Sequence, residues 1–374
     1  MPDKYDCIVI GGGVNGGSVA YNLAKRGKKV LLLEKDRLAS KASGAAAGML
    51  AAQAELEEDG PLFHLAKKSR SMFPALAKEI KKLTGMDIEL VNKGMYKVAL
   101  TDEEENRFKH VIELQNRTGE QAKWISREEV RRREPALSSA IRGAMYIEKD
   151  GQVAAPQITL GFLKAAAVLG VEIREFTEVF AFLFDNGKIA GVRTSGGSFE
   201  SDKVILTGGA WSESLLPDSE IPFNTYPVKG ECFSVVAHRP LLTGTIFSHS
   251  CYLVPKKGGR LLVGATVRPN TFDQTVTVGG ISYLMEQAKK LVPEIIHAEW
   301  EKAWAGIRPQ TSDGLPYLGE HPAYEGLYVA TGHFRNGILL SPITGELIAG
   351  LVDREPLSAD LRAFRIDRHL EKTL

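Results

Sequence analysis

The chain has 374 residues, enough for two or three structural units of roughly 150 residues each. Apolar residues make up 44% of it and charged residues 25%, which excludes collagen-like, low-complexity and disordered classes. Because 47 Lys and Arg balance 46 Asp and Glu and no segment concentrates basic residues, nucleic acid is not an expected partner.

The cysteines argue against a disulfide framework or a metal site. Cys7, Cys232 and Cys251 are widely spaced and lack CxxC pairs or nearby histidines at metal-ligand spacing. The uncharged stretch 7–24 is as long as a short membrane span, but its Gly, Asn and Ser residues make it too polar. Acidic residues precede it where a secretory signal carries basic ones, so we expect a cytoplasmic protein without integral membrane contact.

The chain opens with the pattern of a βαβ unit. Residues 6–10 form a Val- and Ile-rich strand, a run of glycines follows, and 14–26 has helical periodicity. Gly27 is a typical helix stop, and 29–34 reads as a second buried strand that ends on an acid. The small-residue stretch 43–54 comes next, where only small side chains would let a large ligand lie against the backbone.

Helical and strand signals then alternate to the end of the chain. Helices are expected over residues 62–83, 101–119, 156–169, 280–291 and 337–351. Strands are expected over residues 88–99, 143–147, 171–184, 192–198, 203–206, 231–237, 252–255, 261–266 and 327–330. Since βαβ signals alternate with meander signals and no linker or repeat interrupts them, we predict an α/β (mixed α+β) fold of two interleaved domains.

The first glycine run carries a dinucleotide-binding pattern. Gly11, Gly13 and Gly16 have the spacing GxGxxG between a strand and a helix, and Glu34 ends the next strand. One glycine makes the turn, one lets the backbone approach a pyrophosphate at the helix N-terminus, and one permits close helix packing. Glu34 can accept hydrogen bonds from a ribose. The alternative is a glycine turn with a purely structural role.

The last strand and helix favour FAD over NAD. A turn at Thr331 and Gly332 connects the strand 327–330 to the helix that starts at Gly337. The N-terminus of that helix can stabilise the negative charge that a reduced flavin carries at its pyrimidine edge. We therefore predict FAD as the cofactor.

Several motifs together resemble one known family. They are GGGxxG with LLLEK at the start, SGAAAGML at 43–50, PVKGE at 227–231, WAGIRP at 304–309, DGLPYLG at 313–319 and ATGHFRNGILLSP at 330–342. In this order they resemble the FAD-dependent D-amino-acid oxidase superfamily and, within it, the glycine oxidases of bacterial thiamine biosynthesis. The resemblance covers residues 5–368.

The resemblance implies a fold, an activity and an assembly. It implies a Rossmann-like FAD-binding domain made of residues 1–85, 152–218 and 310–374, interleaved with an antiparallel-sheet substrate domain of residues 86–151 and 219–309. It implies oxidation of glycine, sarcosine or small D-amino acids by molecular oxygen, giving the α-keto acid, ammonia or an amine, and hydrogen peroxide. A homotetramer and a role in supplying glycine imine for thiazole synthesis are also implied.

The resemblance also places the cofactor. It implies FAD contacts from Gly11, Gly13, Val14, Asn15, Gly16, Glu34, Lys35, Ala42, Ser43, Ala47, Gly48 and Met49, from the backbone of Val179, and from His333, Phe334, Arg335, Asn336, Gly337, Ile338 and Leu339. Relatives with covalently attached flavin use a cysteine in the C-terminal third, and this chain has none beyond Cys251. Non-covalent FAD is therefore expected.

Tyr252, Arg308 and Arg335 are the catalytic candidates that the resemblance implies, with Met49 beside the substrate. The sequence supports Arg308 independently, because a small amino acid needs a bidentate cation for its carboxylate and Arg308 lies in an apolar stretch. The plainer alternatives are a structural ion pair for Arg308, packing for Tyr252 and a turn cap for Arg335. Neither His249 nor His333 is expected to be an essential base.

Hydride transfer from the substrate α-carbon to flavin N5 is the expected mechanism, with the protein mainly orienting the substrate. Three rivals stay open: a sarcosine oxidase or D-amino-acid dehydrogenase of the same fold, a subunit with a vestigial redox site, and an NAD-dependent dehydrogenase. Ser250 and Val267 differ from the His and Met of some glycine oxidases, which leaves the substrate preference open.

Overall fold

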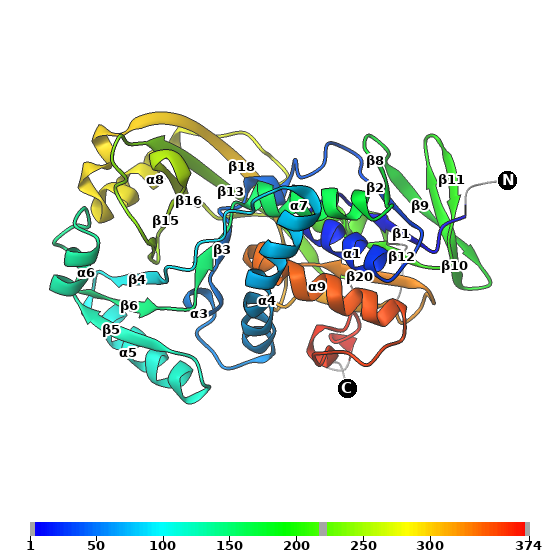
Figure 1. Cartoon of the computed structure of the whole chain (residues 1–374), viewed down its shortest axis with the longest axis horizontal. Helices are drawn as coiled ribbons and strands as arrows, with labels where there is room; N and C mark the ends of the chain where they lie inside the picture. The colour runs from blue at the N-terminus through cyan, green and yellow to red at the C-terminus, as the bar shows by residue number, and fades with distance from the viewer. Residues whose placement is uncertain (1–3, 217–222, 371–374) are drawn as a thin grey trace.

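The computed structural model of the chain describes residues 4–216 and 223–370. Its strands form two main sheets that lie side by side, each with its own helices (Figure 1). Within the described ranges, no helix is long and apolar enough to cross a membrane.

The first sheet is mostly parallel and has the order β19-β20-β12-β1-β2-β8. Its strands are β1 (Cys7–Ile10), β2 (Val30–Leu33), β8 (Glu172–Arg174), β12 (Val204–Leu206), β19 (Tyr317–Glu320) and β20 (Leu327–Thr331). Only β19 runs antiparallel to its neighbour. The central strands are short Val, Ile and Leu runs that are buried on both faces, as parallel strands covered on two sides must be.

Helices cover one face of this parallel sheet. They are α1 (Val14–Lys25), α4 (Pro61–Thr84), α7 (Ala155–Val168) and α9 (Gly337–Val352). Small residues let these helices pack closely: a Cβ on Gly345 of α9 would lie 2.2 Å from Oγ of Ser18 in α1. The resulting core includes Val9, Leu32 and Ile343.

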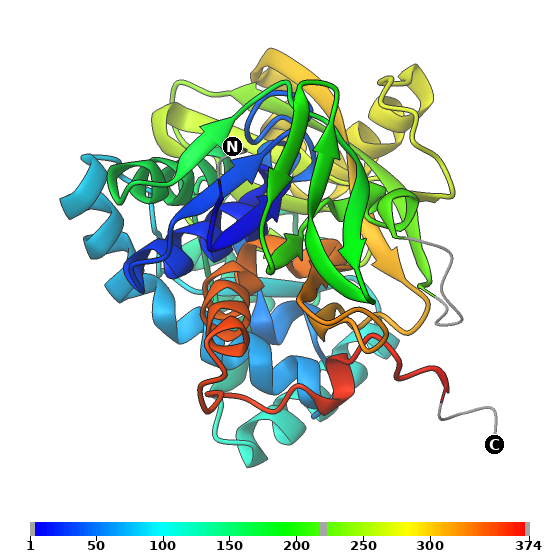
Figure 2. The ribbon, with the colours of Figure 1, turned by 90° about the vertical axis from the view of Figure 1, so that its right-hand side faces the viewer.

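A smaller antiparallel sheet covers the opposite face (Figure 2). It consists of β9 (Val179–Asp185), β10 (Lys188–Thr194) and β11 (Gly197–Glu200). Side chains such as Ile189 and Val192 pack against Ile8 and Leu31 of the parallel sheet. The parallel sheet is therefore sandwiched between helices and strands.

The second main sheet is built around a long antiparallel pair, β13 (Thr225–Val236) and β18 (Glu299–Thr311). The other strands, in order from β13, are β16 (Arg260–Gly264), β15 (Tyr252–Pro255), β14 (Thr245–Phe247), β4 (Met95–Ala99), β6 (Gly143–Ile147) and β5 (Ala122–Ser126), and β17 (Arg268–Pro269) also pairs with β13. Helices α5 (Asp102–Arg117), α6 (Arg127–Arg133) and α8 (Val278–Leu291) pack on this sheet.

A short irregular segment connects the two halves. It contains α2 (Ala42–Ala45), β3 (Met49–Leu50) and α3 (Ala52–Glu55), and β3 pairs with β7 (Gly151–Gln152). The remaining 3₁₀ turns are η1 (Gly209–Trp211), η2 (Glu213–Leu215), η3 (Lys257–Gly259), η4 (Pro293–His297), η5 (Phe334–Asn336) and η6 (Arg362–Phe364). Side chains of this segment pack into the cores of both halves, with Leu50 and Ala52 in one and Ala51 and Ala54 in the other, so it lies between the sheets.

Most predicted elements are present, but several differ in their bounds. The expected strand over residues 88–99 is regular only over Met95–Ala99, and the expected strand over 171–184 is divided into β8 and β9. The expected strand over 192–198 crosses the turn between β10 and β11, and β18 was not predicted. The predicted division into five domain segments stays a prediction, and its boundary at residues 218 and 219 lies outside the described residues.

Candidate active site

The glycine turn after β1 brings two backbone segments into close contact. Gly11 has φ of +111°, a conformation that side chains with a Cβ rarely adopt. A Cβ on Gly16 would lie 1.9 Å from the carbonyl oxygen of Gly11, so helix α1 can start here only with glycine at this position. The N-terminus of α1 consequently faces a long cavity between the two halves of the chain.

Glu34 follows β2 and points into the same cavity. Its carboxylate accepts hydrogen bonds from the backbone N–H of Gly12 at 2.6 Å and of Asp36 at 2.8 Å. These bonds fix the acid beside the glycine turn, where it could reach a ribose. Nearby, the ammonium group of Lys35 lies 4.7 Å from the centre of the Trp211 ring.

The small-residue segment forms one wall of the cavity. Ser43 accepts a hydrogen bond from the N–H of Val14 at 2.9 Å, which attaches this segment to the start of α1. Gly48 has φ of +82°, and a Cβ there would lie 2.0 Å from the carbonyl oxygen of Val153. The backbone is thus pressed against β7 on one side and leaves the cavity open on the other.

The turn between β20 and α9 forms another wall. His333 is buried, and its Nε2 lies 3.0 Å from Oγ1 of Thr344. Burial lowers the pKa of His333 to about 3, so this imidazole is neutral and a weak base. Its Nδ1 and the side-chain oxygen of Asn15 are buried without a hydrogen-bond partner among the described residues, and both side chains line the cavity.

These orphaned polar atoms fit a polar cofactor, because buried donors and acceptors are normally paired. The cavity encloses about 1720 Å³ of non-atom space, part of it open to solvent. Of the predicted cofactor residues, it is lined by Gly11, Gly13, Val14, Asn15, Glu34, Lys35, Ala42, Ser43, Ala47, Gly48, Met49, Val179, His333, Phe334, Arg335, Asn336, Gly337 and Ile338. Gly16 and Leu339 do not line it.

Leu339 is buried in the helical core, and its carbonyl oxygen accepts a hydrogen bond from Ser69. Thr207, Gly208 and Gly209 line the cavity although we did not predict them as cofactor residues. The signal was available in the sequence, since these residues form a glycine turn after a buried strand, as Gly11 does.

Arg308 lies at the end of the cavity formed by the second sheet. It belongs to β18, and its guanidinium lies over Gly230 of the neighbouring β13, where a Cβ would be only 2.1 Å from Nη2. Its Nη1 donates to the carbonyl oxygen of Thr266 at 3.3 Å. Among the described residues no carboxylate pairs with Arg308, so a partly buried cation faces the cavity ready for an anion.

Tyr252 of β15 lies beside Arg308 in the cavity wall. Only 7% of the residue is exposed, and its hydroxyl lies 3.6 Å from Sγ of Cys232. Burial raises the pKa of Tyr252, so the phenol stays protonated and can donate a hydrogen bond. Gly264 makes room for the ring, because a Cβ there would lie 2.5 Å from the hydroxyl.

Arg335 has a carboxylate partner that the sequence did not reveal. Its Nε and Nη2 donate to Glu55 of α3 at distances of 2.6 to 3.1 Å. Both side chains are largely buried, with 24% and 13% of their surface exposed. The two arginines of the cavity therefore differ, since one is paired within the chain and the other faces the cavity without a carboxylate.

A second cavity adjoins the first. Glu55, Tyr252 and Arg335 line both cavities. His249 lines only the second one, as do Ser250 and Val267, the two residues that differ from some glycine oxidases, whereas Arg308 lines only the first.

The model of the FAD dependent oxidoreductase family (DAO) matches residues 6–351. The chain belongs to this family. FAD is the family's cofactor, and the cradle at the carboxyl ends of β1, β2 and β20 has the residues to hold it. The resemblance, the fold class and the FAD prediction are confirmed, while the roles of the individual site residues stay predictions.

Known relatives cover the whole chain. A glycine oxidase of Geobacillus kaustophilus is 47% identical over 374 residues, covering 100% of this chain and 99% of the relative. A glycine oxidase of Bacillus subtilis is 39% identical, with 98% of each chain covered. A bifunctional ThiO/ThiG protein of Synechocystis is 34% identical and covers 100% of this chain, which corresponds to 55% of that protein.

Solved structures agree with these sequence matches. The crystal structure of glycine oxidase from G. kaustophilus superposes with a TM-score of 0.95, covering 98% of this chain and 99% of that chain at 47% identity. Glycine oxidase from Bacillus cereus gives 0.90 at 46% identity, with 94% and 95% covered. An L-proline dehydrogenase from P. horikoshii also gives 0.90, but at 25% identity, with 100% and 99% covered.

Proposed function

We propose that this protein is a glycine oxidase, which converts glycine, water and molecular oxygen to glyoxylate, ammonia and hydrogen peroxide. The observation that carries the proposal is Arg308, a partly buried cation that faces the cavity beside the buried phenol of Tyr252 and has no carboxylate partner in the described chain. Relatives named glycine oxidase at 47% and 39% identity support this substrate.

The carboxylate of glycine would bind to the guanidinium of Arg308 and to the hydroxyl of Tyr252, with Arg335 as a second cation in the same cavity. Bidentate binding by Arg308 would fix both the position and the direction of the Cα–carboxylate bond. Small side chains, such as those of Ala46, Ala47 and Ala51, line the cavity and would let the flavin ring lie close to the backbone of this segment. The preference for glycine rests on the named relatives rather than on these side chains.

FAD, when bound, accepts two electrons from the amine carbon of the substrate and passes them to oxygen. The protein's part is to hold the α-carbon within reach of the flavin ring and to exclude water from the cavity. His333 is a poor candidate for a general base because its pKa is about 3. We infer that glycine reacts after its ammonium group has lost a proton to solvent.

Non-covalent FAD, a cytoplasmic location and a homotetramer complete the proposal. Cys232 is the cysteine to test, because it lines the cavity, whereas Cys251 lines only the second cavity and Cys7 lines neither. Acid precipitation should release the yellow cofactor into the supernatant, and a yellow pellet would show a covalent bond.

Light scattering tests the proposed homotetramer. The similarity to a ThiO/ThiG protein supports a role in supplying thiazole synthesis.

The decisive experiment is an absorbance spectrum before and after anaerobic addition of glycine, followed by admission of air and a peroxide assay. Bleaching of the flavin bands by glycine and their return with one peroxide per glyoxylate would support the oxidase. Bleaching by sarcosine or a D-amino acid alone would move the substrate. Bleaching by glycine with re-oxidation by a quinone but not by air would identify a dehydrogenase and overturn the oxidase proposal.

A further inference from the structure

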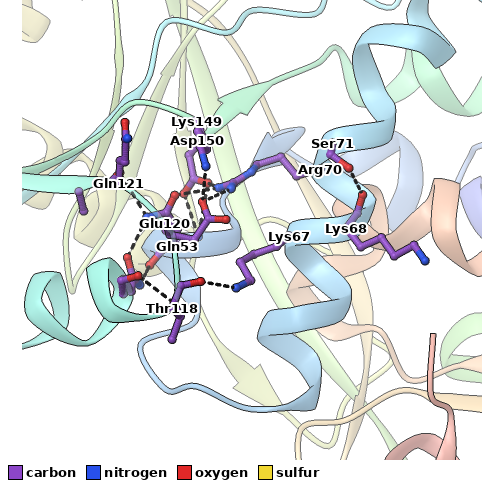
Figure 3. A network of polar contacts seen from close by, with 12 residues as sticks. Gln53, Lys67, Lys68, Arg70, Ser71, Thr118, Glu120, Gln121, Lys149 and Asp150 are labelled. Atoms are coloured by element: carbon purple, nitrogen blue, oxygen red, sulfur yellow. Dashed lines mark hydrogen bonds and ion pairs between the residues drawn. The ribbon is translucent and has the colours of Figure 1, made fainter. Parts of the chain in front are cut away.

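A buried charged cluster surrounds α3, the short helix whose last residue is Glu55 (Figure 3). Its centre is Asp150, which has no exposed surface and lies in the turn between β6 and β7. The carboxylate of Asp150 accepts hydrogen bonds from the backbone N–H of Gln53 at 3.1 Å and of Ala54 at 3.0 Å. Asp150 itself does not line the cavity at Arg308.

Two helices hold this carboxylate and α3 together. Arg70 of α4 forms an ion pair with Asp150 and donates to the side-chain oxygen of Gln53 at 3.0 Å. It also pairs with Glu120 at 2.6 Å. Gln115 of α5 donates to the carbonyl oxygen of Gln53 at 3.0 Å. The peptide groups of α3 are thus attached to α4, α5 and the β6–β7 turn.

The carbonyl side of α3 is held by a second buried charge. The ammonium group of Lys97 donates to the carbonyl oxygen of Ala54 at 2.6 Å and pairs with Glu57 at the same distance. Only 6% of the Lys97 side chain is exposed. Ala54 therefore lies between a carboxylate on its N–H side and an ammonium group on its C=O side, and the next residue is Glu55.

Even when buried charges are paired, the cost of removing them from water offsets most of their mutual attraction, so this cluster is not explained by stability alone. Its geometric effect is to fix the position of Glu55, whose carboxylate holds two nitrogens of Arg335 inside the cavity. Among the described residues, nothing pairs with the third nitrogen, Nη1, of Arg335. Its direction depends on the pair with Glu55, because a guanidinium is a rigid fork.

We propose that Asp150 is a positioning residue for substrate binding: through the backbone of α3 it holds Glu55, and through Glu55 it holds Arg335 in the orientation that accepts the substrate carboxylate together with Arg308. This inference rests on the proposed function. Asp150 acts at a distance and touches neither substrate nor cofactor.

The test is a double-mutant cycle with Asp150→Asn and Glu55→Gln. Asp150→Asn keeps the shape of the side chain but removes the charge that two N–H groups and Arg70 share. It should raise the KM for glycine, and the dissociation constant of acetate measured from the flavin spectrum, by about five- to tenfold, with kcat changed less than about twofold. Glu55→Gln should have a similar effect, and the double variant should add nothing to it.

Glu134→Gln is the matched control. Glu134 is also a buried carboxylate that accepts two backbone N–H bonds, from Thr243 at 2.9 Å and from Gly244 at 2.7 Å, but it lines neither cavity at the site. It should lower the melting temperature as Asp150→Asn does while leaving the KM and the acetate dissociation constant at their wild-type values. This comparison separates positioning from general loss of stability.

Two results would overturn the proposal: a folded Asp150→Asn enzyme with wild-type KM and acetate affinity, or an equal effect of Asp150→Asn with and without Glu55→Gln. If Asp150→Asn does not fold, Gln53→Met takes its place, because it removes the side-chain bonds to Arg70 and Gln115. It must then show the same loss of additivity with Glu55→Gln. A wild-type enzyme that does not oxidise glycine would refute the proposed function. The double-mutant cycle could still be measured, because acetate binding needs no turnover.

Discussion

Gly230→Ala tests the assignment of Arg308 without touching the arginine. In the structure, a Cβ on residue 230 would lie 2.1 Å from Nη2, 2.4 Å from Cζ and 2.6 Å from Nη1 of Arg308. Carbon contacts have their optimum near 3.5 to 4.0 Å, so the guanidinium must move by roughly 1.4 Å or more. Because it is the end of a flexible side chain, it can move while the strand pair β13 and β18 stays intact.

A displacement of this size breaks the fork geometry that a bidentate carboxylate requires. Loss of a hydrogen bond to a charged group costs about 1.5 to 3 kcal/mol, and each 1.4 kcal/mol corresponds to a factor of ten. We expect the KM for glycine to rise about 10- to 100-fold. The melting temperature and the ratio of flavin to protein should stay near their wild-type values, because Gly230 belongs to β13 and not to the glycine turn or the turn before α9 that form the FAD cradle.

The assay is steady-state peroxide production over a range of glycine concentrations, with flavin content and thermal unfolding measured on the same preparations. Gly196→Ala is the control, since Gly196 lies in the turn between β10 and β11 and the nearest atom to its Cβ would be 3.8 Å away. An unchanged KM in a folded, flavin-containing Gly230→Ala enzyme would refute the role of Arg308. So would a loss of kcat with no change in the KM.

Four further predictions follow from the same geometry. Arg308→Lys keeps the charge but not the fork, so the KM for glycine should rise about tenfold with FAD retained, as steady-state kinetics and the 450 nm absorbance will show. Tyr252→Phe should weaken acetate binding by about 5- to 10-fold in a flavin titration, because one hydrogen bond to the carboxylate is lost. Gly16→Ala should purify without FAD, since its Cβ would lie 1.9 Å from the carbonyl oxygen of Gly11; a yellow protein would contradict this. His333 has a folded-state pKa of about 3, below its ordinary value of about 6.5, so as the pH falls below about 6.5 the unfolded chain binds a proton that the folded chain does not, and stability is lost. The unfolding free energy measured with urea at pH 6.5 and 5.0 should therefore fall less steeply with pH in His333→Gln, by up to about 1.4 kcal/mol per pH unit.

The FAD cradle could be predicted from the sequence because its parts are local. The strand before Gly11, the helix after it and the acid at the end of the next strand all lie within the first 34 residues, and each has a pattern of its own. The turn before α9 is also formed by residues that are close together in the sequence. Local hydrogen bonds and short loops determine the shapes of these turns, so the sequence pattern alone indicates them.

The substrate end of the site could be predicted only in part. Arg308 was recognised by its motif, but the long strand β18 that carries it was not, because several of its side chains are half-exposed and no simple alternation marks it. Glu55 had no signal at all. It follows an alanine-rich stretch, and its partner Arg335 is 280 residues away, so only the tertiary fold brings α3 and the turn η5 that carries Arg335 together.

The two parts of the site are carried by different sheets. The cradle at α1 and α9 is part of the parallel sheet, whereas Arg308 and Tyr252 are carried by β18 and β15 of the other sheet. The distance between cofactor and substrate anchor therefore depends on segments that contact both halves, above all residues 42–57. This segment is held by polar contacts such as those from Lys97 and from Trp304, whose indole donates to the carbonyl oxygen of Ala45 at 2.9 Å. Substitutions that weaken these contacts should change substrate binding more than they change the stability of either core, because each core is closed by its own sheet and helices.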